Sequence, residues 1–156
     1  MTVREPAPYT SRARRRDGND DDLHYLEETR AALRPAMVLS LAAGSSESSG
    51  HQVRALARDA LTTQTRQLAE VSDCLLTWDR TEVAVPAPAE TGTARELQGK
   101  ATDRDFADQL KAHSHLSIAA ARAEMVTGAS HRVRQIAEDA IRSHYRQLAA
   151  LDEDLT

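Results

Sequence analysis

The chain has 156 residues and a net charge of −4 at pH 7, and only 3% of its residues are aromatic. This length fits a single domain, and the scarcity of aromatic residues favours packed helices over a β-sandwich. The single cysteine, Cys74, excludes an intramolecular disulfide and a cysteine-based zinc site. No apolar run approaches the roughly 18 residues of a membrane-spanning helix, so we expect no membrane insertion.

Residues 1–18 are polar and basic, with four arginines between Arg12 and Arg16. A secretory signal requires an apolar stretch of roughly 7–15 residues after such charges, but acidic residues follow instead. We therefore expect a disordered basic tail on a cytoplasmic protein. Such a charge cluster is typical of a solvated tail, and we expect contact with nucleic acid nowhere else in the chain.

The first predicted helix begins at Asp20 to Asp22, where negative charge suits a helix N-terminus. Apolar residues recur at helical spacing from Leu23 to Leu41. Pro35 lies inside this pattern and is expected to kink or interrupt the helix. A loop rich in Gly and Ser, residues 44–50, separates this helix from the next.

The second predicted helix starts near His51, and a similar sequence starts near His131. Ten of the positions from 51 to 71 carry the same residue as the equivalent position from 131 to 151, where chance gives about two. A period this long that occurs only twice indicates a duplicated supersecondary unit. In both copies apolar residues recur at steps of three and four residues. In the second copy these residues are Val133, Ile136, Ala137, Ala140, Ile141, Leu148, Leu151 and Leu155.

A linker of residues 79–101, with two prolines and a glycine, predicts an irregular crossover. The third helix is expected to begin at Thr102 and to end at Gly128. Ser130 is then placed to cap the fourth helix.

The predicted fold is all-α, a four-helix bundle made of two tandem helical hairpins over residues 19–156. Hairpin one covers residues 20–78 and hairpin two covers residues 102–155. One hairpin has too little core to stand alone, whereas two can bury a shared apolar stripe. The linker is long enough to span the bundle or to let hairpins swap between two chains.

Two histidines, His113 and His144, lie on the apolar stripes of the third and fourth helices. One precedes and the other follows the turn centre near residue 129 by almost the same distance along the chain, so an antiparallel hairpin places them at nearly the same height. Neutral imidazoles suit copper, zinc and iron. The pair therefore predicts a metal site, a pair of buried polar residues, or a boundary position. His115 points roughly 200° away from His113 around the helix, which makes it a poorer third ligand.

The equivalent positions in the first hairpin are Leu33, opposite His113, and Gln64, opposite His144. This difference argues against a symmetric metal centre. Any metal site is expected in the second hairpin alone.

The chain resembles a widespread bacterial family of unknown function in three segments, which are Asp105–Phe106, His113–His115 and Val133–Leu148. The hallmark helix of that family reads Met-Ile-Pro-His-His-Gln and is followed by a Met. The resemblance implies a ferritin-like fold, frequent duplication and, in some members, copper binding through Met and His.

The match to the hallmark helix covers only part of the motif. His113 aligns with the first family His, whereas Ser114 stands at the second, and Leu110 and Ala120 stand at the two Met positions. A related ferritin-like family, with a His in its last helix where His144 lies, fits about as well.

We therefore expect a small cytoplasmic binding or assembly protein, without enzymatic activity, whose metal site is eroded. A protein partner or self-association is expected. The alternative is a metal-binding protein, with copper as the first candidate metal, that uses His113 and His144 with help from His115, Met125 or Met37. A third hypothesis is a ferritin-like metal-dependent oxidoreductase, although the Glu-x-x-His spacing of di-metal carboxylate sites does not occur.

Overall fold

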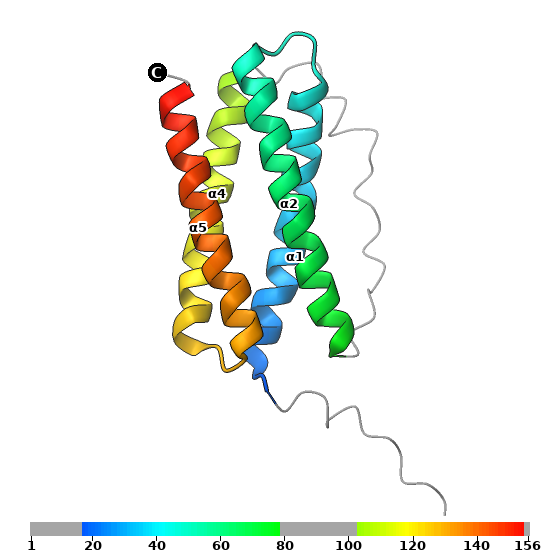
Figure 1. The fold of residues 1–156 in the computed structure, drawn as a ribbon, viewed down its shortest axis with the longest axis vertical. Helices are drawn as coiled ribbons and strands as arrows, with labels where there is room; N and C mark the ends of the chain where they lie inside the picture. The colour runs from blue at the N-terminus through cyan, green and yellow to red at the C-terminus, as the bar shows by residue number, and fades with distance from the viewer. Residues whose placement is uncertain (1–16, 79–102, 155–156) are drawn as a thin grey trace, which may run out of the picture.

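The computed structural model describes residues 17–78 and 103–154 and folds them into four α-helices (Figure 1). These helices are α1 (Asp20–Ser45), α2 (His51–Thr77), α4 (Asp103–Thr127) and α5 (His131–Asp154). The described residues contain no strand, so the all-α prediction is confirmed. Nearly all of the predicted basic tail and the whole predicted linker lie outside the described residues, as does Thr102.

The helices form a four-helix bundle in which each helix packs mainly against two antiparallel neighbours (Figure 1). α1 packs against α2 and α4, whereas α5 packs against α4 and α2. α2 ends where α1 begins, and α4 begins at the opposite end of the bundle. There the Gly50 N–H donates to Asp103 Oδ2 at 2.9 Å, which joins the α1–α2 loop to the start of α4. Trp78 and Asp103 therefore lie at opposite ends of the bundle.

Side chains at the N-termini of α1 and α5 satisfy backbone donors that would otherwise lack partners. Before α1, Asn19 Oδ1 accepts from the Asp22 N–H at 3.0 Å, and Asp22 Oδ2 accepts from the Asn19 N–H at 2.7 Å. Before α5, Ser130 Oγ accepts from the Val133 N–H at 3.3 Å. The predicted start of the first helix and the predicted cap of the last helix are both confirmed.

The core consists of two apolar clusters, one toward each end of the bundle. Every helix contributes to both clusters, as the helical spacing of apolar residues requires. The first cluster lies toward the α4–α5 turn and includes Leu26, Val71, Leu75 and Val133. The second cluster lies toward the α1–α2 loop and includes Leu39, Leu56, Phe106, Leu110 and Leu148.

The structure contradicts an interruption at Pro35, which is one of the two effects predicted there, and also a loop that begins at residue 44. α1 continues through Pro35 without interruption. Pro35 lacks the N–H that would bond the Ala31 carbonyl, but both residues are exposed, so water can solvate that carbonyl. Gly44 also belongs to the helix and is buried against α2, so the connecting loop begins only at Ser46.

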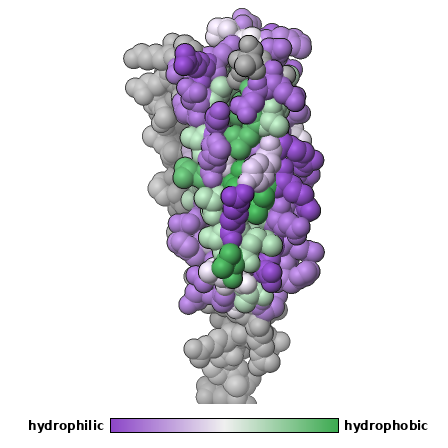
Figure 2. Space-filling view, turned by 90° about the vertical axis from the view of Figure 1, so that its left-hand side faces the viewer, coloured by the Kyte–Doolittle hydropathy of each residue, from purple (hydrophilic) through white to green (hydrophobic). Residues whose placement is uncertain are grey.

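The surface is mainly polar, with local apolar exposure. Figure 2 shows the side that carries α4 and α5, where hydrophilic side chains border a band of paler and apolar ones. Two α4 side chains stand out, because Leu116 is 73% exposed and Val126 is 84% exposed. Within residues 17–78 and 103–154, no helix combines the length and apolar character needed to cross a bilayer.

Candidate functional site

A layer of polar side chains crosses the bundle about halfway along its length. We call it the polar layer, and it comprises two residues from each of α2, α4 and α5, which are Gln64, Gln67, His113, Ser114, His144 and Gln147. Ser114, Gln64 and His144 are only 0%, 2% and 4% exposed. Uncharged polar groups are buried without a free-energy cost only where they find hydrogen-bond partners. The hydrogen bonds that this layer makes and leaves unmade therefore indicate whether it can bind a further polar group.

The structure brings His113 and His144 together, as their placement around the turn predicts. Their ring centroids lie 5.4 Å apart, and the ring planes meet at 72°. His144 is almost fully buried, whereas His113 is partly buried. The second hairpin therefore presents two imidazoles to each other in the interior of the bundle.

Ser114 and Gln147 fix the protonation of His144. The Ser114 hydroxyl donates to Gln147 Oε1 at 2.8 Å, and the same Oγ lies 3.3 Å from His144 Nδ1. A hydroxyl has a single proton, so Oγ accepts from His144. The imidazole proton therefore lies on Nδ1, and the lone pair of the neutral ring lies on Nε2.

Both imidazoles are neutral at pH 7. Burial is the main cause, and the neighbouring His113 adds to it, so that the pKa of His144 falls to about 4. Burial likewise lowers the pKa of His113, because a low-dielectric interior disfavours the charged form. The pair can therefore offer lone pairs to a metal ion or to a hydrogen-bond donor without first losing a proton.

Three buried atoms of the polar layer have no hydrogen-bond partner among the described residues. They are Nε2 of His113 and both Oε1 and Nε2 of Gln64. Buried polar atoms are nearly always bonded, so three such atoms in one layer mark a place with unused capacity to bind a polar group.

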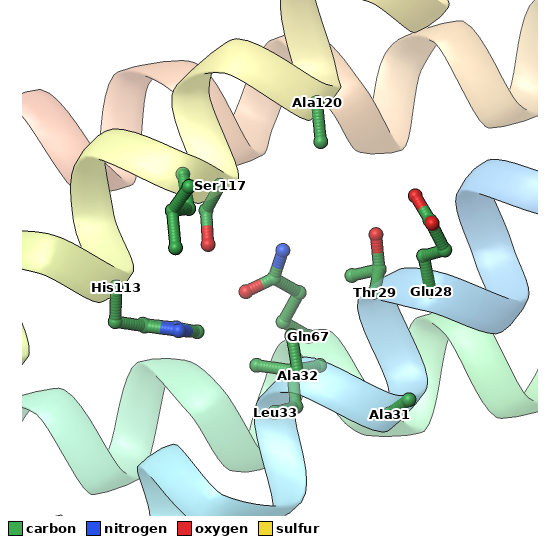
Figure 3. Close-up of a pocket in the computed structure, with 10 residues that line it drawn as sticks. Glu28, Thr29, Ala31, Ala32, Leu33, Gln67, His113, Ser117 and Ala120 are labelled. Carbon is green, nitrogen blue, oxygen red and sulfur yellow. The ribbon is translucent and has the colours of Figure 1, made fainter.

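A groove between α1 and α4, with a volume of about 540 Å³, leads to this layer (Figure 3). Its walls are largely aliphatic and include Ala32 and Leu33 from α1 and Ala120 from α4. His113 and Gln67 also line it, and the His113 ring lies across the space from α1 (Figure 3). Apolar walls with a few polar atoms are typical of small-molecule sites.

The other predicted ligands do not join the pair. His115 lies on the exposed side of α4, as its position two residues from His113 implies. Met125 packs against the apolar cluster toward the α4–α5 turn, and Met37 is partly buried on α1. Among the residues that the structure describes, no group of three His, Cys, Asp or Glu side chains is placed to hold a metal ion.

The sequence did not reveal the roles of Gln67 and the groove. Gln67 is 7% exposed, although the apolar spacing points to Leu68 as the buried residue. A glutamine beside a leucine carries no pattern that marks it as interior. The groove depends on small residues of two helices far apart in the chain, Ala32 and Ala120, and only the fold brings them together.

Comparisons of the chain with family models, with curated proteins and with solved structures find no match.

Proposed function

We propose that this chain is a binding protein whose ligand occupies the groove between α1 and α4 and bonds to the polar layer. The observation that carries this proposal is His113, a residue that lines the groove and whose Nε2 atom is buried without a hydrogen-bond partner among the described residues. A ligand with an aliphatic or aromatic body and one hydrogen-bonding group fits these walls. The neutral imidazole then accepts or donates one hydrogen bond, and the body displaces water from the alanines.

The fold supports a ferritin-like assignment for this bundle. Ferritin-like bundles contain one long crossover that joins opposite ends, and here α2 ends and α4 begins at opposite ends of the bundle. The similarity between positions 51–71 and 131–151 supports an origin by duplication of one hairpin. In this proposal Leu33 and Gln64 replace imidazoles in the first hairpin, which leaves an eroded metal site and a binding function.

The groove proposal is tested by filling the groove. Ala120→Phe places a ring between α1 and α4, whereas Ala150→Phe places the same ring in the groove between α2 and α5, which Ala150 lines. We would titrate each protein with a set of small aromatic amides and alcohols and follow backbone amide NMR signals. We expect shifts at Ala32 and His113 in the natural protein and in Ala150→Phe, but none in Ala120→Phe. Equal shifts in both variants, or shifts elsewhere only, would overturn the proposal.

A second candidate function, copper binding, is favoured by the bonding of His144. Ligating histidines usually donate their second ring N–H to an outer partner, and Nδ1 of His144 has that partner in Ser114. Its Nε2 lone pair and the Nε2 of His113 supply two nitrogen ligands. Such ligands suit copper first among the available metals.

Metal content separates the two candidates. Tag-free protein would be exposed to micromolar copper and analysed by elemental mass spectrometry, together with His113→Ala, His144→Ala and the exposed control His115→Ala. Copper binding predicts stoichiometric metal in the natural protein and in the control, and its loss in the other two variants. Metal-free natural protein would leave ligand binding in the groove as the function.

Assembly with a protein partner or a second copy is the third part of this proposal. It is supported by Leu116 and Val126, two exposed apolar side chains of α4. Contiguous exposed apolar patches mark sites where proteins associate, and Leu116 and Val126 are the two large apolar side chains that α4 exposes. A mass measurement in solution, repeated with Leu116→Ser and Val126→Ser, tests self-association, and a monomer at high concentration would exclude it.

A further inference from the structure

Two carboxyl groups are buried together where α1 begins and α4 meets α5. Asp22 of α1 is 0% exposed, and Glu124 of α4 is 2% exposed. Both border Gly128, because a Cβ atom at that position would overlap Glu124 Oε1 and would lie 2.7 Å from Asp22 Oδ1. This pair lies at the end of the bundle, away from the polar layer, and does not depend on the function proposed above.

Asp22 holds the start of α1 against the α4–α5 turn. In addition to the Asn19 N–H, its carboxylate accepts from the Ala129 N–H at 3.0 Å and from the Ser130 N–H at 3.1 Å. Asn19 Nδ2 also donates to the Thr127 carbonyl at 2.8 Å. Burial alone would raise the pKa of Asp22, but hydrogen bonds from Glu124 and from these three backbone groups outweigh it and leave the pKa below its usual value. Asp22 is therefore the charged member of the pair.

The Glu124 carboxyl group, unlike that of Asp22, accepts no hydrogen bonds from backbone N–H groups in the described part of the chain. Neither Oε1 nor Oε2 finds a donor with hydrogen-bond geometry among the described residues. Burial first, and then the adjacent Asp22, raise the pKa of Glu124 to about 8, since two close carboxyl groups do not readily carry two negative charges. The protonated Glu124 has one O–H to donate, and Asp22 is the acceptor beside it.

The other charged and titratable groups around Glu124 do not replace that proton. On α1, Asp21 adds further negative charge, and the buried Tyr25 is itself raised in pKa to about 12, mainly by burial. On α5, Arg134 favours the ionised form of Glu124 but is outweighed. Loss of the proton therefore leaves two negative charges side by side, and the described residues around them do not offset that repulsion.

We infer that Glu124 and Asp22 form a proton-dependent latch, which holds the start of α1 against the α4–α5 turn and releases it when Glu124 ionises. Release requires Asp22 or Glu124 to reach water, and the short route is outward, because the pair lies at the end of the bundle. The α1 start then moves away from the turn while the rest of the helix stays packed.

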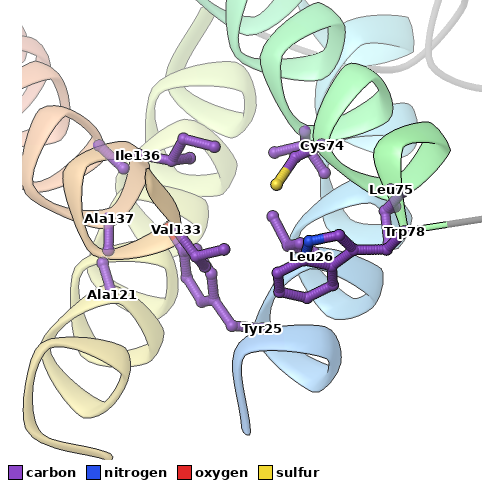
Figure 4. Close-up of a cluster of buried hydrophobic side chains, with 11 residues drawn as sticks. Tyr25, Leu26, Cys74, Leu75, Trp78, Ala121, Val133, Ile136 and Ala137 are labelled. Atoms are coloured by element: carbon purple, nitrogen blue, oxygen red, sulfur yellow. The ribbon is translucent and has the colours of Figure 1, made fainter. Parts of the chain in front are cut away.

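The sole tryptophan of the chain, Trp78, reports on this region. It is 4% exposed and packs in the same apolar cluster as Tyr25 and Leu26 of α1 (Figure 4). Gly18, just before α1, lies directly against its indole ring. Movement of the α1 start therefore uncovers the indole, and its fluorescence emission shifts to longer wavelength.

The latch is tested by measuring Trp78 emission from about pH 5 to pH 10 in the natural protein, in Glu124→Gln, and in Glu138→Gln, a control at an exposed α5 position. We expect a shift to longer wavelength with a midpoint near pH 8 in the natural protein and the control, and no transition in Glu124→Gln. A flat profile in the natural protein, or the same transition in Glu124→Gln, would overturn the inference.

A second measurement keeps the test decisive if Glu124→Gln does not fold. The amide NMR signals of Ala129 and Ser130, whose N–H groups bond to Asp22, would be followed through the same pH range in the natural protein. We expect both to shift with the Trp78 midpoint while far-ultraviolet circular dichroism still reports intact helices. Amide signals that stay constant, or helices that unfold together with the fluorescence change, would exclude a local latch.

Discussion

Replacement of Gln64 by methionine is the sharpest test of the polar layer. Gln64 lies on α2 between the two apolar clusters, is 2% exposed, and leaves both polar atoms of its amide without a partner among the described residues. Methionine has a similar unbranched length and no amide. A buried polar group without a partner destabilises the folded state by about 1–3 kcal/mol, so we expect Gln64→Met to raise the free energy of unfolding by about 2 kcal/mol.

Urea unfolding at room temperature, followed by circular dichroism, measures this difference as a change in the transition midpoint at constant slope. Gln67→Met is the matched control, one turn further along the same helix. Gln67 is also buried, but it lines the groove, where water can bond its amide, so we expect its replacement to leave stability unchanged or lower it. Binding in the groove should weaken in both variants, because each removes a polar atom from the layer.

If the polar layer is a binding site, Gln64→Met should make the protein more stable and its binding weaker. Functional sites commonly retain buried polar groups that an apolar side chain would replace with a gain in stability. If Gln64→Met instead lowered the free energy of unfolding by more than about 1 kcal/mol, the Gln64 amide would have partners in the folded protein. The polar layer would then be a structural hydrogen-bond network with no spare bonding capacity for a ligand.

Three further changes test the end of the bundle and the imidazole pair. Asp22→Ala should lower the free energy of unfolding by about 2 kcal/mol, measured by urea unfolding at pH 6, because three backbone N–H groups lose their acceptor. Gly128→Ala should lower it by about 1–3 kcal/mol through overlap with the Glu124 carboxyl, and by less in a Glu124→Ala background, which a double-mutant cycle would show. Folding lowers the pKa of His144 from 6.5 to about 4, so this residue contributes stability that is complete above pH 6.5 and decreases as the pH falls toward 4. Urea unfolding at several pH values should show that loss, roughly 3 kcal/mol in all, and His144→Gln should remove it; an unchanged pH profile in that variant would contradict the assignment.

The sequence predicts the helices well because their signals are local. The apolar residues of α5 recur at helical steps from Val133 to Leu151, and the structure buries Val133, Ile136, Ala137 and Ala140 as expected. Ser130 is a good cap because its side chain reaches a backbone N–H three residues away. His113 and His144 come to the same level along the bundle axis because they are almost equally far along the chain from the short turn that joins α4 and α5.

Contacts between distant segments carry no such signal. Asp22 and Ser130 are 108 residues apart, and nothing around Asp22 distinguishes it from the neighbouring acidic residues that merely suit a helix N-terminus. Glu124 looks like an ordinary surface residue of an amphipathic helix until α1 is packed over it. The groove has the same origin, because small residues on α1 and α4 open a space only after the helices are neighbours.

The two hairpins agree where the scaffold requires it and differ at the polar layer. At one end Asp22, just inside α1, accepts from Ser130 before α5; at the other end Asp103, at the start of α4, accepts from Gly50 before α2. Ser130 and Gly50 occupy equivalent positions of the repeat, each immediately before its matching histidine, so each hairpin supplies an aspartate that caps the other in the same way. At the polar layer, by contrast, Leu33 of the first hairpin faces the groove together with His113 of the second. Helix ends tolerate few solutions to the capping problem, whereas an interior position tolerates any well-packed side chain, so the two copies can differ at Leu33 and His113 without any change in how the bundle is built.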